Sequence, residues 1–141
     1  MNPTNAKAEQ QCDSAIGFVT ADIETRIGGK ITSVGRSEAA NSPFQDAKEE
    51  IIIELDANMS RGTPLKYRRA SPAQVSANEN IVNSKSLSLS YADKIIRSCQ
   101  GVARLGLGLY ENRPYYSLHD NNQIIPDTCG SNQVWGQQIC E

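Results

Sequence analysis

Few residues of this chain could carry out acid–base or nucleophilic chemistry. The sequence contains one histidine, His119, followed directly by Asp120. A Ser-His-Asp or Cys-His site would have to use this histidine. Because neighbouring residues on a strand point to opposite faces of a sheet, the two residues do not form a ready-made catalytic dyad. A histidine at a strand end is more often solvated or hydrogen-bonded, so catalysis by His119 is not favoured.

The acidic residues offer two carboxylate pairs, Glu49 with Glu50 and Asp22 with Glu24. Two carboxyl groups can hydrolyse a glycosidic bond when they converge on a cleft and one has a raised pKa. The sequence does not show such convergence, and an exposed charge is the usual state of these residues. The histidine and the carboxylates also lack the spacing of a metal-ligand motif, so neither a metal nor a cofactor is expected.

Aromatic and polar residues around one turn form the candidate binding surface. We expect a hairpin whose tyrosine, arginine and asparagine side chains lie beside a groove left by Gly106 and Gly108. Such side chains suit a sugar, peptide or protein surface. Tyrosines paired across two strands can also simply stabilise a hairpin, and that alternative stays open. The candidate binding residues are Arg104, Tyr110, Asn112, Arg113, Tyr115 and Tyr116.

The four cysteines, Cys12, Cys99, Cys129 and Cys140, contain no C-x-x-C pair, which argues against a zinc ribbon or a thioredoxin-like site. Four cysteines allow three pairings. A bridge from Cys129 to Cys140 would close a short glycine-containing segment, which leaves Cys12 to pair with Cys99. We expect disulfides rather than free thiols, because a polar chain has a thin core that gains stability from cross-links.

Size and charge exclude several classes of partner. A chain of 141 residues is the length of one domain, and it is 38% hydrophobic with a net charge of −2. This charge provides no positive field for nucleic acid or an anionic membrane. No apolar run approaches the roughly 20 residues that span a bilayer. Neither a nucleic-acid partner nor direct insertion into a membrane is therefore expected.

The polar residues 1–11 are expected to be a disordered tail or the remnant of an export signal. Ala6-Lys7-Ala8 has the A-x-A form after which signal peptidase cuts, although no apolar stretch precedes it. We interpret this segment as the end of an export signal whose apolar part is missing. On this interpretation the domain works outside the cytoplasm, in a periplasm, in a lumen or as a secreted protein.

Hydrophobic spacing predicts two helices and about four strands in the order α-β-β-α-β-β. Helices are expected over 14–27 and 84–99; Asp13 or Ser14 can cap the start of the first, and Gly28 follows its end. Alternation between Val19 and Ile27 leaves a strand as the alternative for the first helix. The remaining predictions are strands over 30–37, 49–56, 102–110 and 115–119, a short further strand in "IIPDTC", and a long polar loop over 57–80.

These elements predict a single α+β domain over residues 12–141. An antiparallel sheet of about four strands with both helices on one face is the economical packing. The three consecutive isoleucines of segment 49–56 predict a central strand that is buried on both faces. Cys12 and Cys99 would meet if the two helices run antiparallel, because a bridge needs Cα atoms within about 7 Å.

Short motifs recur at the ends of these elements. A cysteine precedes the first predicted helix, and the second helix ends in Ile95-Ile96-Arg97-Ser98-Cys99. A strand from Val102 to Gly108 follows, and Trp135-Gly136-Gln137-Gln138-Ile139-Cys140 stands near the end. With these features the chain resembles a family of small, uncharacterised exported proteins of cyanobacterial type, over most of residues 12–140 except 57–80. The resemblance implies export and a structural role for the cysteines, and no activity.

Two functions remain open from the sequence. The first is a non-catalytic extracytoplasmic binding or accessory domain whose partner is a protein or a cell-surface component. The second is a small extracytoplasmic hydrolase that uses His119 or a carboxylate pair. The lack of a recognisable catalytic constellation favours the first.

Overall fold

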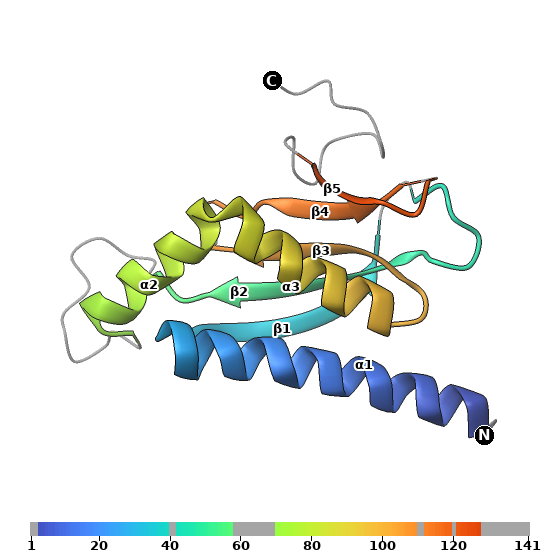
Figure 1. Cartoon of the computed structure of the whole chain (residues 1–141), viewed down its shortest axis with the longest axis horizontal. Coiled ribbons are helices and arrows are strands. Elements are labelled where there is room, and N and C mark those ends of the chain that lie inside the picture. Colours follow the sequence, from blue (N-terminus) through green and yellow to red (C-terminus); the bar gives the residue numbers. More distant parts are fainter. Residues whose placement is uncertain (1–2, 40–41, 58–69, 110–111, 120, 128–141) are drawn as a thin grey trace.

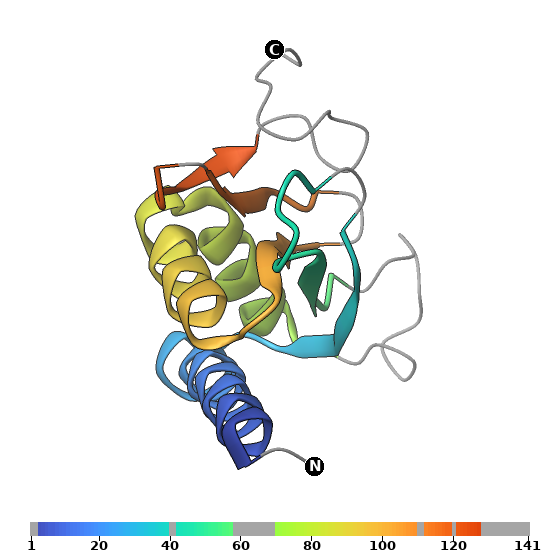
Figure 2. The same cartoon turned by 90° about the vertical axis from the view of Figure 1, so that its right-hand side faces the viewer.

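Helices cover one face of a mixed sheet (Figures 1 and 2). The computed structural model describes residues 3–39, 42–57, 70–109, 112–119 and 121–127, and within them it contains three α-helices, one π-helical segment and five strands. The fold class is α+β, as predicted. The elements are α1 (Pro3–Ala21), η1 (Asp22–Ile27), β1 (Ile31–Glu38), β2 (Glu49–Leu55), α2 (Pro72–Asn83), α3 (Lys85–Ser98), β3 (Val102–Gly108), β4 (Tyr115–Leu118) and β5 (Ile124–Asp127).

The strand order is β1-β2-β3-β4-β5, and β2 and β3 are parallel. The predicted antiparallel sheet is wrong at this pair, although the other pairs are antiparallel. A parallel pair needs a long crossover, and α2 with α3 provides it. The central strand is β3, which is buried along its whole length. Strand β2 lies inside the sheet between β1 and β3, as predicted, but it is not buried on both faces, because Ile52 is only half-buried while Ile51 and Ile53 are fully buried.

The first helix is longer than predicted. It starts at Pro3 rather than at Asp13 or Ser14, so from residue 3 the predicted tail is helical. From Ala6 to Gln11 the residues are alanine, lysine, glutamate and glutamine, which are good helix formers. The strand alternative for 14–27 is wrong, and the helical segment ends at Gly28 with φ 86°, as expected for a glycine after a helix.

The predicted polar loop over 57–80 is helical in its second part. Residues 58–69 lie outside the described residues, and α2 begins at Pro72. Ser71 starts this helix with a capping box: its hydroxyl accepts from the Gln74 N–H at 3.1 Å, and the Gln74 side chain accepts from the Ser71 N–H at 2.8 Å. The Ser-Pro-x-Gln pattern was therefore a helix signal in a stretch with few apolar residues.

The core lies between the helices and the sheet. The helix-facing side chains of β2 and β3 pack against α1, η1, α2 and α3, and Tyr116 of β4 joins them. The best-buried members are Val19, Ile23, Ile51, Ile53, Ile81, Ile95, Leu105 and Leu107. In the described ranges no helix is both long enough and apolar enough to cross a membrane.

Candidate functional site

Three of the six residues of the predicted binding surface are buried in the interior. Arg104, Tyr115 and Tyr116 expose 2%, 7% and 2% of their surface. Arg104 and Gly106 lie on the sheet face opposite the helices, because Leu105 between them is part of the helix-facing core. Tyr116 packs in that core instead. Tyr115 and Tyr116 therefore point to opposite faces and do not form an exposed tyrosine surface.

The groove predicted at the two glycines is filled. A Cβ atom on Gly106 would come within 2.9 Å of the Tyr115 ring, and one on Gly108 within 2.7 Å of Arg113 Cα. The absence of side chains lets this ring and this turn lie directly on β3. Asn112 is exposed and Arg113 is half-buried at the turn, while Tyr110 lies outside the described residues.

Arginine and acidic side chains form a polar cluster on this sheet face. Arg104 Nε donates to Ser117 Oγ at 3.0 Å, and its guanidinium lies 5.4 Å from the centre of the Tyr115 ring. Arg113 Nη2 lies 3.0 Å from Glu54 Oε1. Burial raises the pKa of Glu50, and the two arginines oppose the shift. These contacts join strands to one another, which is the pattern of a structural cluster.

The two carboxylate pairs do not converge. Glu49 and Glu50 lie on opposite sheet faces, and Glu49 binds Arg36 on the helix side. Asp22 accepts bonds from Arg26 and, at 2.5 Å, from the Tyr91 hydroxyl, and these bonds lower the pKa of Asp22 to about 2. Glu24 instead accepts from the Ile31 N–H at 3.2 Å. Neither pair has the geometry that carboxylate-assisted hydrolysis requires.

The histidine makes no hydrogen bond to these carboxylates through Nε2. His119 Nε2 is buried and has no hydrogen-bond partner in the structure as described, and Asp120 lies outside the described residues. Among the described residues, no group of three or more histidine, cysteine or acidic side chains could hold a metal ion.

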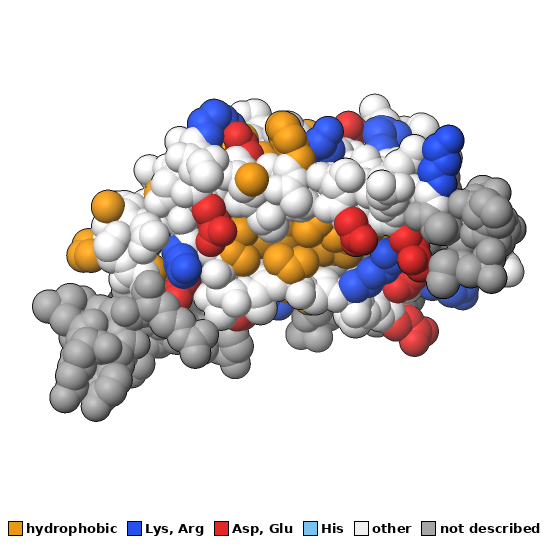
Figure 3. All heavy atoms as spheres, turned by 90° about the horizontal axis from the view of Figure 1, so that it is seen from below, with side chains coloured by type: hydrophobic (Ala, Val, Ile, Leu, Met, Phe, Trp, Pro, Cys, Tyr) orange, Lys and Arg blue, Asp and Glu red, His pale blue; other side chains and the backbone are white. Residues whose placement is uncertain are grey.

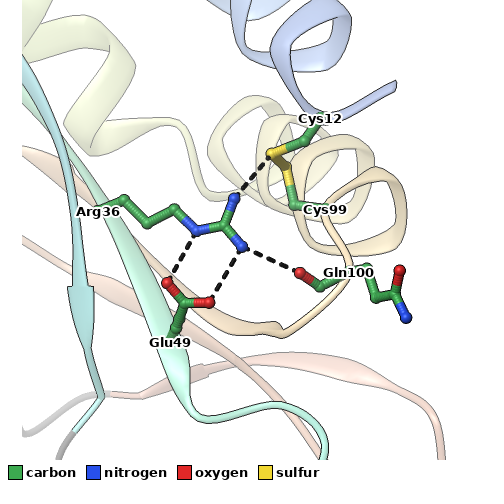
Figure 4. Close-up of a disulfide and its surroundings, with 5 residues drawn as sticks. All are labelled: Cys12, Arg36, Glu49, Cys99 and Gln100. Atoms are coloured by element: carbon green, nitrogen blue, oxygen red, sulfur yellow. Dashed lines mark hydrogen bonds and ion pairs between the residues drawn. A yellow bond between two sulfur atoms is a disulfide. The ribbon is translucent and has the colours of Figure 1, made fainter. Parts of the chain in front are cut away.

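A disulfide and an arginine fix α1 over the sheet (Figure 4). Cys12 and Cys99 form a disulfide with Cα atoms 4.3 Å apart, which is the predicted bridge between antiparallel helices. Arg36 of β1 donates to Cys12 Sγ at 3.6 Å, to both oxygens of Glu49 at 3.0 and 3.1 Å, and to the Gln100 carbonyl at 3.0 Å. One guanidinium therefore ties β1 and β2 to α1 and to the turn after α3. Cys129 and Cys140 lie outside the described residues.

Within the described residues, no strand pairs with the outer edge of β1. Every residue from Thr32 to Glu38 is exposed. The Ala39 N–H donates to the Lys48 carbonyl at 2.7 Å, and hydrogen-bonded pairs alternate along an antiparallel ladder. The N–H and C=O groups of Val34, Arg36 and Glu38 therefore point away from β2. By contrast, β5 at the other edge is short and contains Pro126, which lacks an N–H.

Helix α1 overhangs this free edge. In both cartoon views α1 lies beyond β1, on the side away from β2 (Figures 1 and 2). Seen from this side, hydrophobic side chains form a strip along the middle of the surface, with charged side chains at both ends (Figure 3). Val34 of β1 is 42% exposed, and Ile16 of α1, Ile27 of η1 and Ile31 of β1 are partly buried. We call the free β1 edge together with this overhanging face of α1 the edge groove.

Sequence reasoning did not find the edge groove, because strand order is not visible in a single sequence. The available signal was the composition of 31–38, which is rich in serine, threonine and glycine and has only Ile31 and Val34 as large apolar residues. Comparison of the chain with family models, with curated proteins and with solved structures finds no match in any of the three. The resemblance to a family of exported proteins therefore stays a prediction.

Proposed function

We propose that this chain is a non-catalytic binding domain, and that it takes up an extended segment of a partner protein as a sixth strand in the edge groove. The observation that carries the proposal is the free edge of β1 beneath an overhanging, partly apolar helix. Backbone hydrogen bonds to an exposed sheet edge are a recurrent way of binding extended peptides.

The edge groove offers both parts of such a site. The outward N–H and C=O groups of Val34, Arg36 and Glu38 would pair with the backbone of the added strand. The added strand would then lie under α1, where its side chains would cover Val34 and Ile16. The disulfide and Arg36 fix the position of α1 relative to β1 in the unbound protein, which lowers the entropic cost of ordering the site on binding.

We place the domain outside the cytoplasm, as the sequence predicts. The bridge between Cys12 and Cys99 supports this proposal, because disulfides persist in oxidising compartments. The alternative of a hydrolase has less support, since neither carboxylate pair converges and His119 Nε2 has no hydrogen-bond partner among the described residues.

Amide hydrogen exchange tests whether the edge is free. In the protein alone, the amides of Val34, Arg36 and Glu38 should exchange rapidly, while those of Gly35 and Ser37, which point to β2, should be protected. Slow exchange at the first three positions would show that the edge is already covered, and would contradict the proposal.

Selection from a random-sequence peptide library displayed on phage tests binding itself. Enriched peptides should protect the three outward amides, and Val34→Pro should abolish binding because it removes an outward N–H while leaving the β1–β2 ladder intact. Val34→Thr keeps the N–H and the branched shape, and should still bind. Thermal unfolding checks that both variants fold. No enrichment, or equal binding by the two variants, would refute strand addition at β1.

A further inference from the structure

We infer that the segment bound in the edge groove carries an apolar side chain opposite Val34 and basic side chains beside it towards the Glu38 end, all on the face turned towards α1. This inference rests on the proposed function and specifies the chemistry of its partner. It follows from which side chains of β1 and α1 border the groove and from their charges.

The first step is the face of β1 that α1 overhangs. Val34 and Arg36 stand opposite Ile53 and Ile51, which are buried under the helices. Directly opposed residues in neighbouring strands share a face. The side chains of Val34, Arg36 and Glu38 therefore lie on the helix side, and so would those of the residues paired with them on an added strand. The residue opposite Val34 would lie against exposed apolar surface and should be apolar.

The second step is the side of α1 that borders the groove. Glu9 lines a hollow of about 160 Å³ together with Cys12 and Arg36, which places it on the β1 side of the helix. Spacings of four and then three residues keep positions on one helical face. Asp13 and Ile16 therefore lie on the same side as Glu9, and both Glu9 and Asp13 are exposed.

The third step is the charge that remains at this end of the groove. Arg36 is neutralised by Glu49, which binds it through both oxygens. Glu9, Asp13 and Glu38 then leave a negative border around the end of β1. Lysine or arginine on the bound strand would complement this border, whereas acidic residues would be repelled.

The positive charges of α1 lie elsewhere. Lys7 of α1 and Lys94 and Arg97 of α3 border a separate hollow of about 690 Å³ between the two helices, next to the exposed Phe18. This hollow is on the side of α1 turned away from β1. The two sides of the helix therefore differ in charge, and the side above the free strand edge is the acidic one.

A palindromic peptide, Lys-Thr-Lys-Thr-Val-Thr-Lys-Thr-Lys, is the probe, because it presents lysine and valine on one face in either orientation. Its binding, followed by fluorescence anisotropy of a labelled copy, is compared with that of peptides carrying glutamine or glutamate in place of lysine. We expect the lysine peptide to bind at least about tenfold more tightly than the glutamine peptide at about 20 mM NaCl, and the difference to shrink at about 200 mM.

Variants locate the effect. Asp13→Lys should weaken binding of the lysine peptide by about tenfold. Glu79→Lys, at an exposed position of α2, changes the net charge equally and should weaken binding only by the small effect of that net charge. Equal binding of the lysine and glutamine peptides, or equal loss in the two variants, would overturn the charge preference. In that case protection of the Val34 and Arg36 amides would show that strand addition stands. If no peptide protects these amides, both proposals fail.

Discussion

Removal of the bridge between Cys12 and Cys99 should destabilise the domain mainly through its unfolded state. The two cysteines are 87 residues apart in sequence. In the chain-entropy description, closing a loop of this length removes enough freedom from the unfolded chain to stabilise the fold by about 4.5 kcal/mol at 25 °C. Cross-links usually deliver somewhat less than this value, so we expect a loss of about 3–4.5 kcal/mol.

Urea unfolding measures this loss most cleanly in a Cys129→Ala/Cys140→Ala background, where a reductant can act on one bridge only. The free energy of unfolding is compared with and without reductant, and with Cys12→Ala/Cys99→Ala as an independent removal. An unfolded chain without the bridge is more expanded, so the slope of free energy against urea should also rise.

Two results would refute this reasoning. A loss below about 1 kcal/mol would mean that the long loop contributes little entropy, which the chain-entropy description does not allow. A large loss with an unchanged slope would assign the effect to the folded state, for example to the Arg36 contact with Cys12 Sγ. The variant Arg36→Lys in the oxidised protein measures that contact separately.

Three further predictions concern buried or perturbed polar groups. Asn78→Ala removes a fully buried side chain that makes three hydrogen bonds to the backbone of Lys30 and Asp56, and should lower the free energy of urea unfolding by about 2–4 kcal/mol. The pKa of Asp22 is lowered to about 2, mainly by Arg26, so its ionised carboxylate stabilises the fold above about pH 4. This stabilisation is lost as the pH falls through about 2. The native protein should therefore be more stable than Asp22→Asn at pH 7, and the two should have similar stability at about pH 2. Burial raises the pKa of Glu50, so its ionisation opposes folding; Glu50→Gln should be the more stable protein at pH 7, with the difference disappearing near pH 4 in the same assay.

The sequence pattern correctly predicted those elements that depend only on residues close together in the chain. The spacing of Leu87, Tyr91 and Ile95 identifies α3, and Gly28 marks the end of the first helical segment. The bridge between Cys12 and Cys99 follows from the antiparallel arrangement of two helices, which two amphipathic stripes on one sheet face favour. The N-terminal turns of α1 were missed because they have no apolar stripe to reveal them.

Relations between distant segments were not predictable in the same way. Whether β3 pairs parallel or antiparallel with β2 depends on the end of the sheet at which α3 ends, and the residues of the two strands do not indicate which end this is. Arg104 shows the same difficulty at the candidate site. A charged residue in an apolar strand suggests an exposed surface, but the hydroxyl of Ser117 and the ring of Tyr115 come from another strand and allow Arg104 to be buried.

The order of the cysteines along the chain bears on how the protein matures. Between Cys12 and Cys99 the sequence contains no other cysteine. As the chain is synthesised from its N-terminal side, the first thiol that follows Cys12 is Cys99, its partner in the folded domain. Cys129 and Cys140 emerge only afterwards. Once α1 and α3 are in place, the bridge can close with no downstream competitor present, so oxidative folding in this order needs no reshuffling of a non-native pair.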